Sequence, residues 1–265
     1  MNFWGHVEVL RWVLIRCLVV VLGLAVAVFC FKDFVFDGII LAPVNADFVT
    51  YRLMCRLGKL TGIEGLCPQL GGVEMININL AAQLMTHLRV SFYLAAVVAM
   101  PYIIMEIWLF VKPALYSNEQ RPARYAIVAF FFQFFLGLAL AYYIIFPVTF
   151  NFLANYQVSE RIANQISLNS YIGTFLGLML TMGLVFEMPI VAYFFAKIGV
   201  LKSSFLKRYR KVAFVVVLVL AAFITPSTDV FTMSLVALPL YLLYEFSRVV
   251  VSHVERTETA DDQIA

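Results

Sequence analysis

The sequence predicts an all-α membrane protein with six transmembrane helices, of which the last two are short, and with both termini in the cytoplasm. The first observation is composition: of 265 residues, 63% are hydrophobic and 13% are charged, whereas soluble domains have about 45–50% apolar and about 25% charged residues. The second is a series of long apolar runs between charged clusters. The third is an uneven distribution of lysine and arginine between alternate loops, which sets the orientation of membrane helices.

Six apolar runs mark the predicted spans. A spanning helix needs about 20 apolar residues, so the chain has room for several spans and one modest loop. Helices are expected rather than strands, because no alternating pattern appears and lipid offers no partner to an unpaired backbone. We expect Pro147 to close the third span. The six runs are Trp12–Phe31, about Leu88–Val111, Tyr125–Phe146, Tyr171–Ala196, Val212–Ile224 and about Val230–Val251.

The last two spans are predicted to be short. The fifth run has 13 residues, and the uninterrupted apolar part of the sixth, Val230–Tyr244, has 15. These lengths correspond to roughly 20 and 22 Å of helix, less than the bilayer core of about 30 Å. We expect a hairpin around Thr225–Asp229 that locally thins the bilayer. The alternative is that snorkelling side chains at the helix ends extend each span.

The charge distribution predicts the orientation. Of the 19 lysines and arginines, 13 fall on the side of the two termini, which is therefore expected to be cytoplasmic. Residues 1–253 form one membrane domain in this prediction, with an outer loop over about 32–87. The acidic tail, residues 254–265, is expected to be disordered. The first run lacks a small-x-small cleavage pattern and is predicted to be an uncleaved span.

Three acids are candidate functional residues. Glu187 lies inside the fourth run, where an ionisable side chain is a functional hypothesis; the alternative is a packing role between helices. Glu119 lies in a short cytoplasmic loop and is otherwise an ordinary solvated carboxylate. Glu8 precedes the first span, where the helix dipole also favours an acid. No Walker A loop, dinucleotide fingerprint, HExxH motif or nucleophile elbow is present, so neither an ATPase nor a hydrolase is supported.

Two cysteines lie in the predicted outer loop. Cys55 and Cys67 are 12 positions apart, and an oxidising outer compartment allows them to form a disulfide. The alternative is two unpaired thiols in a partly helical loop. Cys17 and Cys30 lie in the first span and are expected to be apolar packing residues.

Several segments, in order along the chain, resemble the TatC family, the multi-spanning core of the twin-arginine protein translocase. The resemblance covers about residues 5–250, with six spans and a short final pair. The matching segments are Leu41–Val44, Trp108–Arg121, Leu136–Asn155, Val185–Pro189, Ile224–Phe231 and Ala237–Glu245.

The resemblance implies a non-enzymatic receptor for folded proteins that carry Arg-Arg signal peptides. It implies TatA- and TatB-type single-span partners in a multimeric complex of the bacterial inner membrane. The driving force it implies is the proton-motive force, and no cofactor, metal or nucleic acid is expected. The family's signal-binding acid falls on Glu119, near Arg121. Its intramembrane acid falls on Glu187, and its acid in the last outer turn falls on Asp229. Glu245, in the last span, joins Glu187 and Asp229 as a candidate intramembrane or partner-binding group.

One departure concerns the N-terminus. The family pattern resembles His-Leu-x-Glu-Leu-Arg, whereas this chain reads His6-Val7-Glu8-Val9-Leu10-Arg11. Glu8 is one position from the usual acid, which rotates its side chain by about 100° on a helix. We expect Glu8 to assist Glu119 in binding the arginine pair.

Two other functions fit a polytopic protein with a buried acid. One is a secondary transporter that uses Glu187 as an ion or proton site. Such transporters often contain paired repeats with broken helices, and no matching pair of segments is found here. The other is a structural scaffold with no receptor role, which predicts that substitution of Glu119 leaves peptide binding unchanged.

Overall fold

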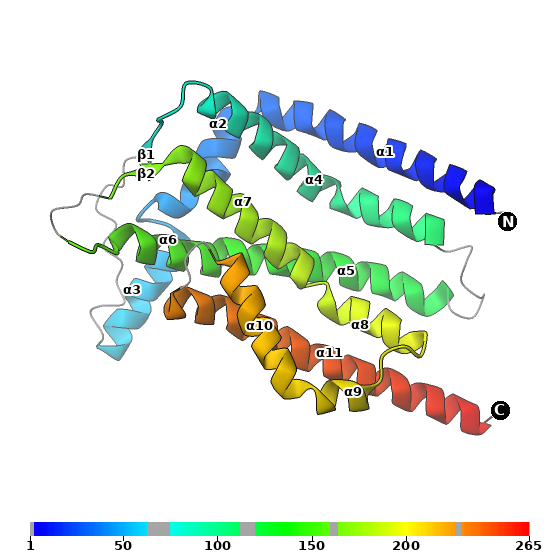
Figure 1. The fold of residues 1–265 in the computed structure, drawn as a ribbon. Coiled ribbons are helices and arrows are strands. Elements are labelled where there is room, and N and C mark those ends of the chain that lie inside the picture. Colours follow the sequence, from blue (N-terminus) through cyan, green and yellow to red (C-terminus); the bar gives the residue numbers. More distant parts are fainter. Residues whose placement is uncertain (1–2, 63–74, 112–119, 160–163, 226–228, 265) are drawn as a thin grey trace. The chain divides into compact units, whose positions relative to one another are not determined.

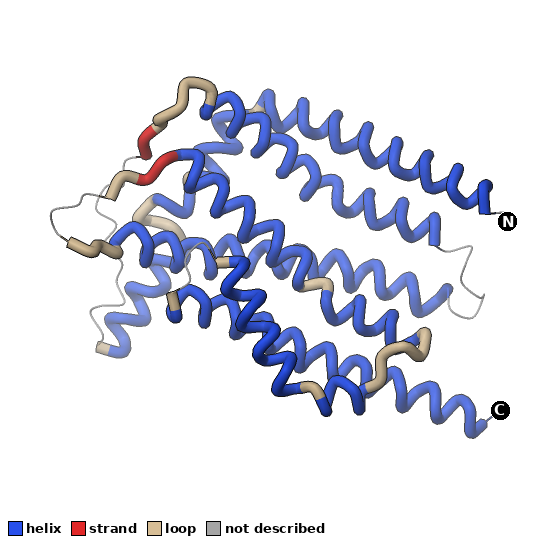
Figure 2. Tube along the Cα trace, in the orientation of Figure 1, coloured by secondary structure: helices blue, strands red, loops and turns tan. Residues whose placement is uncertain are grey.

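The structure is a computed structural model that describes residues 3–62, 75–111, 120–159, 164–225 and 229–264. Almost all of the described chain is helical, apart from a two-stranded parallel pairing (Figures 1 and 2). The helices are α1 (Phe3–Cys30), α2 (Lys32–Val35), α3 (Val49–Thr61), α4 (Ala82–Val111), α5 (Gln120–Leu140), α6 (Phe146–Asn155), α7 (Leu168–Val185), α8 (Met188–Lys197), α9 (Ser203–Arg208), α10 (Arg210–Ile224) and α11 (Val230–Ile264). The strands are β1 (Met75–Ile76) and β2 (Ile166–Ser167).

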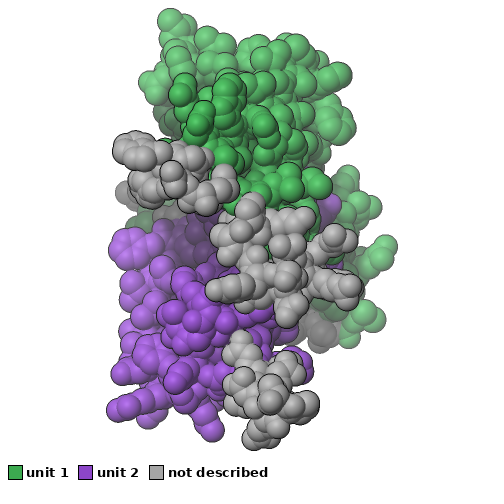
Figure 3. All heavy atoms as spheres, turned by 90° about the vertical axis from the view of Figure 1, so that its right-hand side faces the viewer, with its two compact units in different colours: residues 1–131, 146–176 green, residues 132–145, 177–265 purple. Residues whose placement is uncertain are grey.

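The chain forms two compact units, which Figure 3 shows in different colours. The first unit consists of residues 1–131 and 146–176, and the second of residues 132–145 and 177–265. The helices α5 and α7 each contribute to both units.

Among the residues that the structure describes, six helical stretches are long and apolar enough to cross a membrane, as many as the sequence predicts, but they are not the same six. The stretch Lys32–Leu60, expected in the outer loop, meets the criterion, although turns around Pro43 divide it. The helix α10 has 15 residues and is too short to meet it. The six stretches are Val7–Cys30, Lys32–Leu60, Ala82–Phe110, Ile127–Asn155, Leu168–Lys197 and Val230–Arg256.

In the first unit, α1 and α4 pack side by side in antiparallel directions (Figure 1). Their contact is built from small and branched apolar residues, with Val21, Ala95 and Ala99 at its buried centre. Small side chains let two membrane helices approach closely. At one end of the pair the ring of His87 stacks on Phe29, with ring centroids 3.9 Å apart.

Part of the predicted outer loop is folded against the ends of α6 and α7. The Tyr51 hydroxyl of α3 lies 3.0 Å from the carbonyl oxygens of both Pro43 and Pro147. The Tyr171 hydroxyl donates a hydrogen bond of 2.6 Å to the carbonyl of Ile40. Buried backbone carbonyls need such donors, so these tyrosines fix the irregular segment to the helices.

Pro147 does not end the third predicted span, and that expectation is wrong. The helix continues from α5 through a π-helical turn, η5 (Ala141–Ile145), into α6. Proline lacks the N–H that a regular helix needs. The wider turn directly before Pro147 accommodates this loss, as π-turns do within helices.

In the second unit, glycines bring α5 and α7 into close contact. A Cβ atom on Gly137 would lie 2.7 Å from the Met182 carbonyl and 2.8 Å from the Phe186 side chain. On the facing helix, a Cβ atom on Gly183 would lie 2.9 Å from the Phe134 ring. Both positions therefore require glycine for this packing.

The last helix is longer than the sequence indicates. Pro239 and Glu245 do not interrupt α11, which runs for 35 residues to Ile264. It covers most of the tail that was expected to be disordered. No proline or glycine follows Pro239, and the Ser203 backbone N–H donates a 2.9 Å hydrogen bond to Glu255. The structure thus has a long final helix beside a short α10.

Candidate functional site

The two acids predicted to bind the signal peptide are both connected to one end of the α1–α4 pair. Glu8 is exposed near the start of α1. Glu119 lies outside the described residues, in the segment that follows the end of α4 at Val111. Arg121 lies in the first turn of α5, and its side chain is likewise outside the described part. Since α1 and α4 are antiparallel, the start of one and the end of the other meet at the same end of the pair (Figure 1).

An ion pair that the sequence analysis missed lies farther along the same two helices. The Glu106 side chain of α4 is buried, and its Oε2 atom lies 3.6 Å from Nη1 of Arg16 on α1. Its Oε1 atom accepts a 2.8 Å hydrogen bond from the Tyr102 hydroxyl, one helical turn earlier. Two features of the sequence could have indicated this pair. A tyrosine and a glutamate stand four positions apart, and an arginine lies inside an apolar run.

Glu187 occupies the break between α7 and α8. It is 4% exposed, and within the described part of the chain neither carboxylate oxygen has a hydrogen-bond partner. Pro189 stands in the first turn of α8, where proline is tolerated. The structure encloses the carboxylate of this predicted functional residue.

Glu245 lies within a network of side chains that joins α10 to α11. Its carboxylate pairs with Arg210 and, at 3.0 Å, with Nη2 of Arg248. The Tyr241 hydroxyl donates a 3.1 Å hydrogen bond to Oε1 and accepts one of 3.1 Å from Nε of Arg210. These contacts give both oxygens of the Glu245 carboxylate polar partners within the chain.

Asp229 caps the start of α11. Its Oδ1 atom accepts a 2.8 Å hydrogen bond from the Thr232 backbone N–H, and its Oδ2 atom accepts one from the Thr232 hydroxyl. This is the arrangement of a helix N-cap, which satisfies an amide that has no partner inside the helix. The structure thus gives Asp229 a local role that the sequence analysis did not predict.

Of the cysteines, Cys55 is disulfide-bonded, whereas Cys17 and Cys30 are free thiols. Cys67, the predicted partner of Cys55, lies outside the described residues. The pairing of these two residues therefore stays a prediction.

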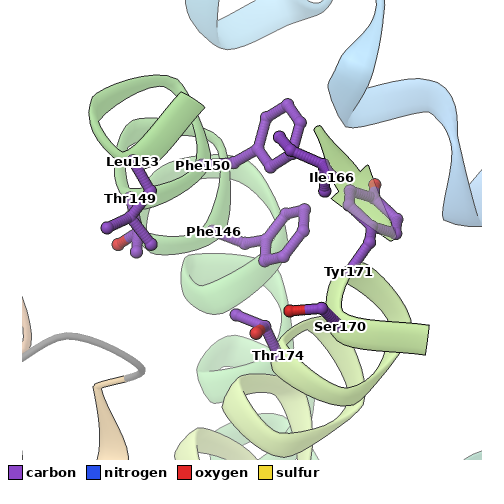
Figure 4. A pocket seen from close by; sticks show the side chains of 8 residues that line it. All are labelled: Phe146, Thr149, Phe150, Leu153, Ile166, Ser170, Tyr171 and Thr174. Atoms are coloured by element: carbon purple, nitrogen blue, oxygen red, sulfur yellow. The ribbon is translucent and has the colours of Figure 1, made fainter. Parts of the chain in front are cut away.

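A small cavity of about 140 Å³ lies in the first unit, between α6 and the start of α7. Figure 4 shows that aromatic rings and hydroxyl groups line it. A cavity of about this size accommodates a benzene-sized group, so it is too small for a helix or a folded protein. Its lining residues are Phe146, Thr149, Phe150, Leu153, Ile166, Ser170, Tyr171 and Thr174.

Comparisons with known proteins give a consistent result. The family model for Sec-independent protein translocase protein (TatC) matches residues 5–239. The TatC protein of Blattabacterium is 34% identical over 258 residues, which cover 97% of both chains. That of Helicobacter pylori strain J99 is 38% identical over 184 residues, or 68% of this chain and 72% of the relative.

A solved structure, described as the crystal structure of the twin arginine translocase receptor TatC, resembles the chain with a TM-score of 0.72 and 30% identity. The match covers 94% of this chain and 99% of the solved one. Together with the apolar helices, these similarities identify a multi-pass membrane protein with a role in protein transport. The chain belongs to the TatC family of Sec-independent protein translocase proteins.

Proposed function

We propose that this protein is the receptor subunit of a twin-arginine translocase in the bacterial inner membrane. It binds the Arg-Arg signal peptides of folded proteins at its cytoplasmic face. It then assembles with TatA- and TatB-type proteins for export driven by the proton-motive force. The observation that carries the proposal is the similarity, over 94% of the chain, to a solved structure described as a twin arginine translocase receptor.

The chemistry of the proposed binding face suits an arginine pair. Guanidinium groups are planar and permanently charged, and they form paired hydrogen bonds with carboxylates. Glu8 supplies a carboxylate at the start of α1, and Glu119 follows in the chain after the end of α4, which lies at the same end of the pair.

Substitution of Glu119 tests this proposal. Glu119→Ala is expected to abolish export and to weaken binding of a twin-arginine peptide, while the protein still inserts into the membrane. Titration of a labelled peptide measures the affinity, and export of a folded reporter measures transport. Asp33→Ala, in α2 just beyond the other end of α1, serves as a control for the loss of one negative charge. Unchanged peptide affinity in Glu119→Ala would contradict the proposed role of Glu119.

For partner binding we propose Glu187 as the main contact. A carboxylate in an apolar surrounding is costly without a partner, and within the described residues Glu187 has none. Because the side chain is enclosed, a partner helix reaches it only if the segment around the α7–α8 break moves. Asp229 and Glu245 contribute to partner binding by holding α11, since their carboxylates already bind within the chain.

We also propose that Cys55 and Cys67 form a disulfide in the outer region. Closing a loop of this length contributes about 3 kcal/mol to stability by restricting the unfolded chain. Alkylation of the protein without prior reduction is expected to label Cys17 and Cys30 under denaturing conditions and to leave the other two unlabelled. Labelling of both Cys55 and Cys67 would exclude the bridge.

A further inference from the structure

The ion pair between Arg16 and Glu106 lies in an unusual place for two charged side chains. Both residues fall inside apolar stretches that are long enough to cross a membrane, Val7–Cys30 and Ala82–Phe110. Glu106 lies five residues before the end of α4 at Val111, which is roughly 7–8 Å along the helix. Charges at such depth are costly unless they are paired, so the chain tolerates each one because of the other.

Apart from the stack of His87 on Phe29 at one end, the described α1–α4 contact consists of side chains that do not by themselves define how the helices align. Its buried centre consists of Val21, Ala95 and Ala99, and the residues around it are also small or aliphatic, including Val20 and Ile103. Such side chains allow close approach, but they form similar contacts if one helix slides or rotates on the other. A directional polar contact is the kind of interaction that selects one register among such alternatives.

Glu106 supplies that directional contact. One carboxylate oxygen accepts the Tyr102 hydrogen bond at 2.8 Å, which orients the group on its own helix. The other oxygen faces Arg16 at 3.6 Å across the interface. The Glu106 side chain is 9% exposed, while that of Arg16 is 60% exposed. The buried and oriented carboxylate of Glu106 thus defines a point on α4, and the more exposed side chain of Arg16 extends from α1 to that point.

We propose that Arg16 and Glu106 are positioning residues that set the register of α1 on α4 and thereby align the start of α1, which carries Glu8, with the end of α4, from which the chain continues to Glu119. This inference rests on the proposed function for what binds at those ends. A slide of one helix by a turn would move Glu8 by about 5 Å relative to the segment after α4. Two carboxylates that must contact adjacent guanidinium groups do not tolerate such a shift.

Exchange of the two charges provides the test. Glu106→Gln and Arg16→Gln each leave one group without its ionic partner and are expected to weaken binding of a twin-arginine peptide about tenfold, a coupling typical of distant sites. The double variant Arg16→Glu with Glu106→Arg restores the pair and is expected to regain most of the affinity. Lys32→Gln is the control with the same change in charge as Arg16→Gln, and Asp33→Asn is the control for Glu106→Gln.

A second measurement reports the register directly. Cysteines at Val20 and Ile103, in a background with Cys17→Ser and Cys30→Ser, are expected to form a disulfide readily in the otherwise unmodified protein. The rate is expected to fall in each single-charge variant and to recover in the exchanged pair. This readout does not depend on any peptide, so it remains informative if Glu119→Ala shows that the proposed receptor function is wrong.

Two outcomes would overturn the inference. If crosslinking between Val20→Cys and Ile103→Cys is the same in Glu106→Gln as in its parent, the pair does not set the register. If the exchanged pair restores crosslinking but not peptide affinity, Glu106 contacts the peptide itself and is not a positioning residue.

Discussion

Glu187 and Glu245 are both acids within the long helical stretches of the second unit, but their surroundings differ. Glu245 has two arginines and a tyrosine hydroxyl around its carboxylate. Glu187 is more deeply buried, and its oxygens have no hydrogen-bond partner within the described part of the chain. A satisfied acid holds helices together, whereas an unsatisfied one costs stability. The difference suggests that Glu245 serves the fold and that Glu187 serves an interaction formed during transport.

The largest effect on transport is expected for Glu187→Leu. Export and crosslinking to TatA- and TatB-type helices are expected to be lost, because leucine cannot form a polar contact with a partner. The free energy of unfolding is expected to stay the same or rise, since a carboxylate in an apolar surrounding costs about 2.5–3.5 kcal/mol at a helix centre. Thermal unfolding in detergent and an export assay measure the two quantities.

The control for Glu187→Leu is Thr181→Val, on the preceding helix α7, which removes a hydroxyl that donates to the Gly177 carbonyl of its own helix. It is expected to leave export unchanged. If Glu187→Leu retains both export and crosslinking, the acid has a packing role only, and the contrast with Glu245 has no functional meaning.

Glu245→Ala is expected to show the opposite pattern. It leaves Arg210 and Arg248 without their carboxylate, and the free energy of unfolding is expected to fall by about 1–2 kcal/mol, a modest value because both arginines are partly exposed. Tyr241→Phe removes only the hydroxyl and is expected to cost about half as much. Export is expected to decline in proportion to the loss of folded protein, as measured by thermal unfolding and quantitative immunoblotting. Lost export with unchanged stability would place Glu245 among the functional acids.

The helical class and the number of candidate spans could be predicted from the sequence, because exposing long apolar runs to water costs free energy and such runs therefore mark membrane helices. It also located Glu187, since a lone carboxylate in such a run stands out. It did not predict the pairing of Arg16 with Glu106, because pairing depends on which helices become neighbours. For the same reason the ion pairs of Glu245 with Arg210 and Arg248 were not predicted, although each charged residue stands out within the sequence.

Errors at helix boundaries have a different cause. Pro147 was predicted to end a span, but a π-turn accommodates it, and Pro239 likewise lies inside a continuous helix. At Pro147 the local widening of the helix accommodates the missing hydrogen bond, as such adjustments do in membrane helices. The rule that a proline ends a helix does not account for such local adjustment of the backbone.

The smallest effect is expected at Asp229, the third of the predicted acids in the second unit. Asp229→Ala removes the acceptor for the Thr232 amide and is expected to lower the free energy of unfolding by about 1 kcal/mol, the usual value of an N-cap. Asp229→Ser keeps a capping oxygen and is expected to restore most of this stability and to preserve export. If Asp229→Ser is stable but does not export, the carboxylate itself binds a partner. Asp229 would then belong with Glu187, and capping would not be the reason for an acid at this position.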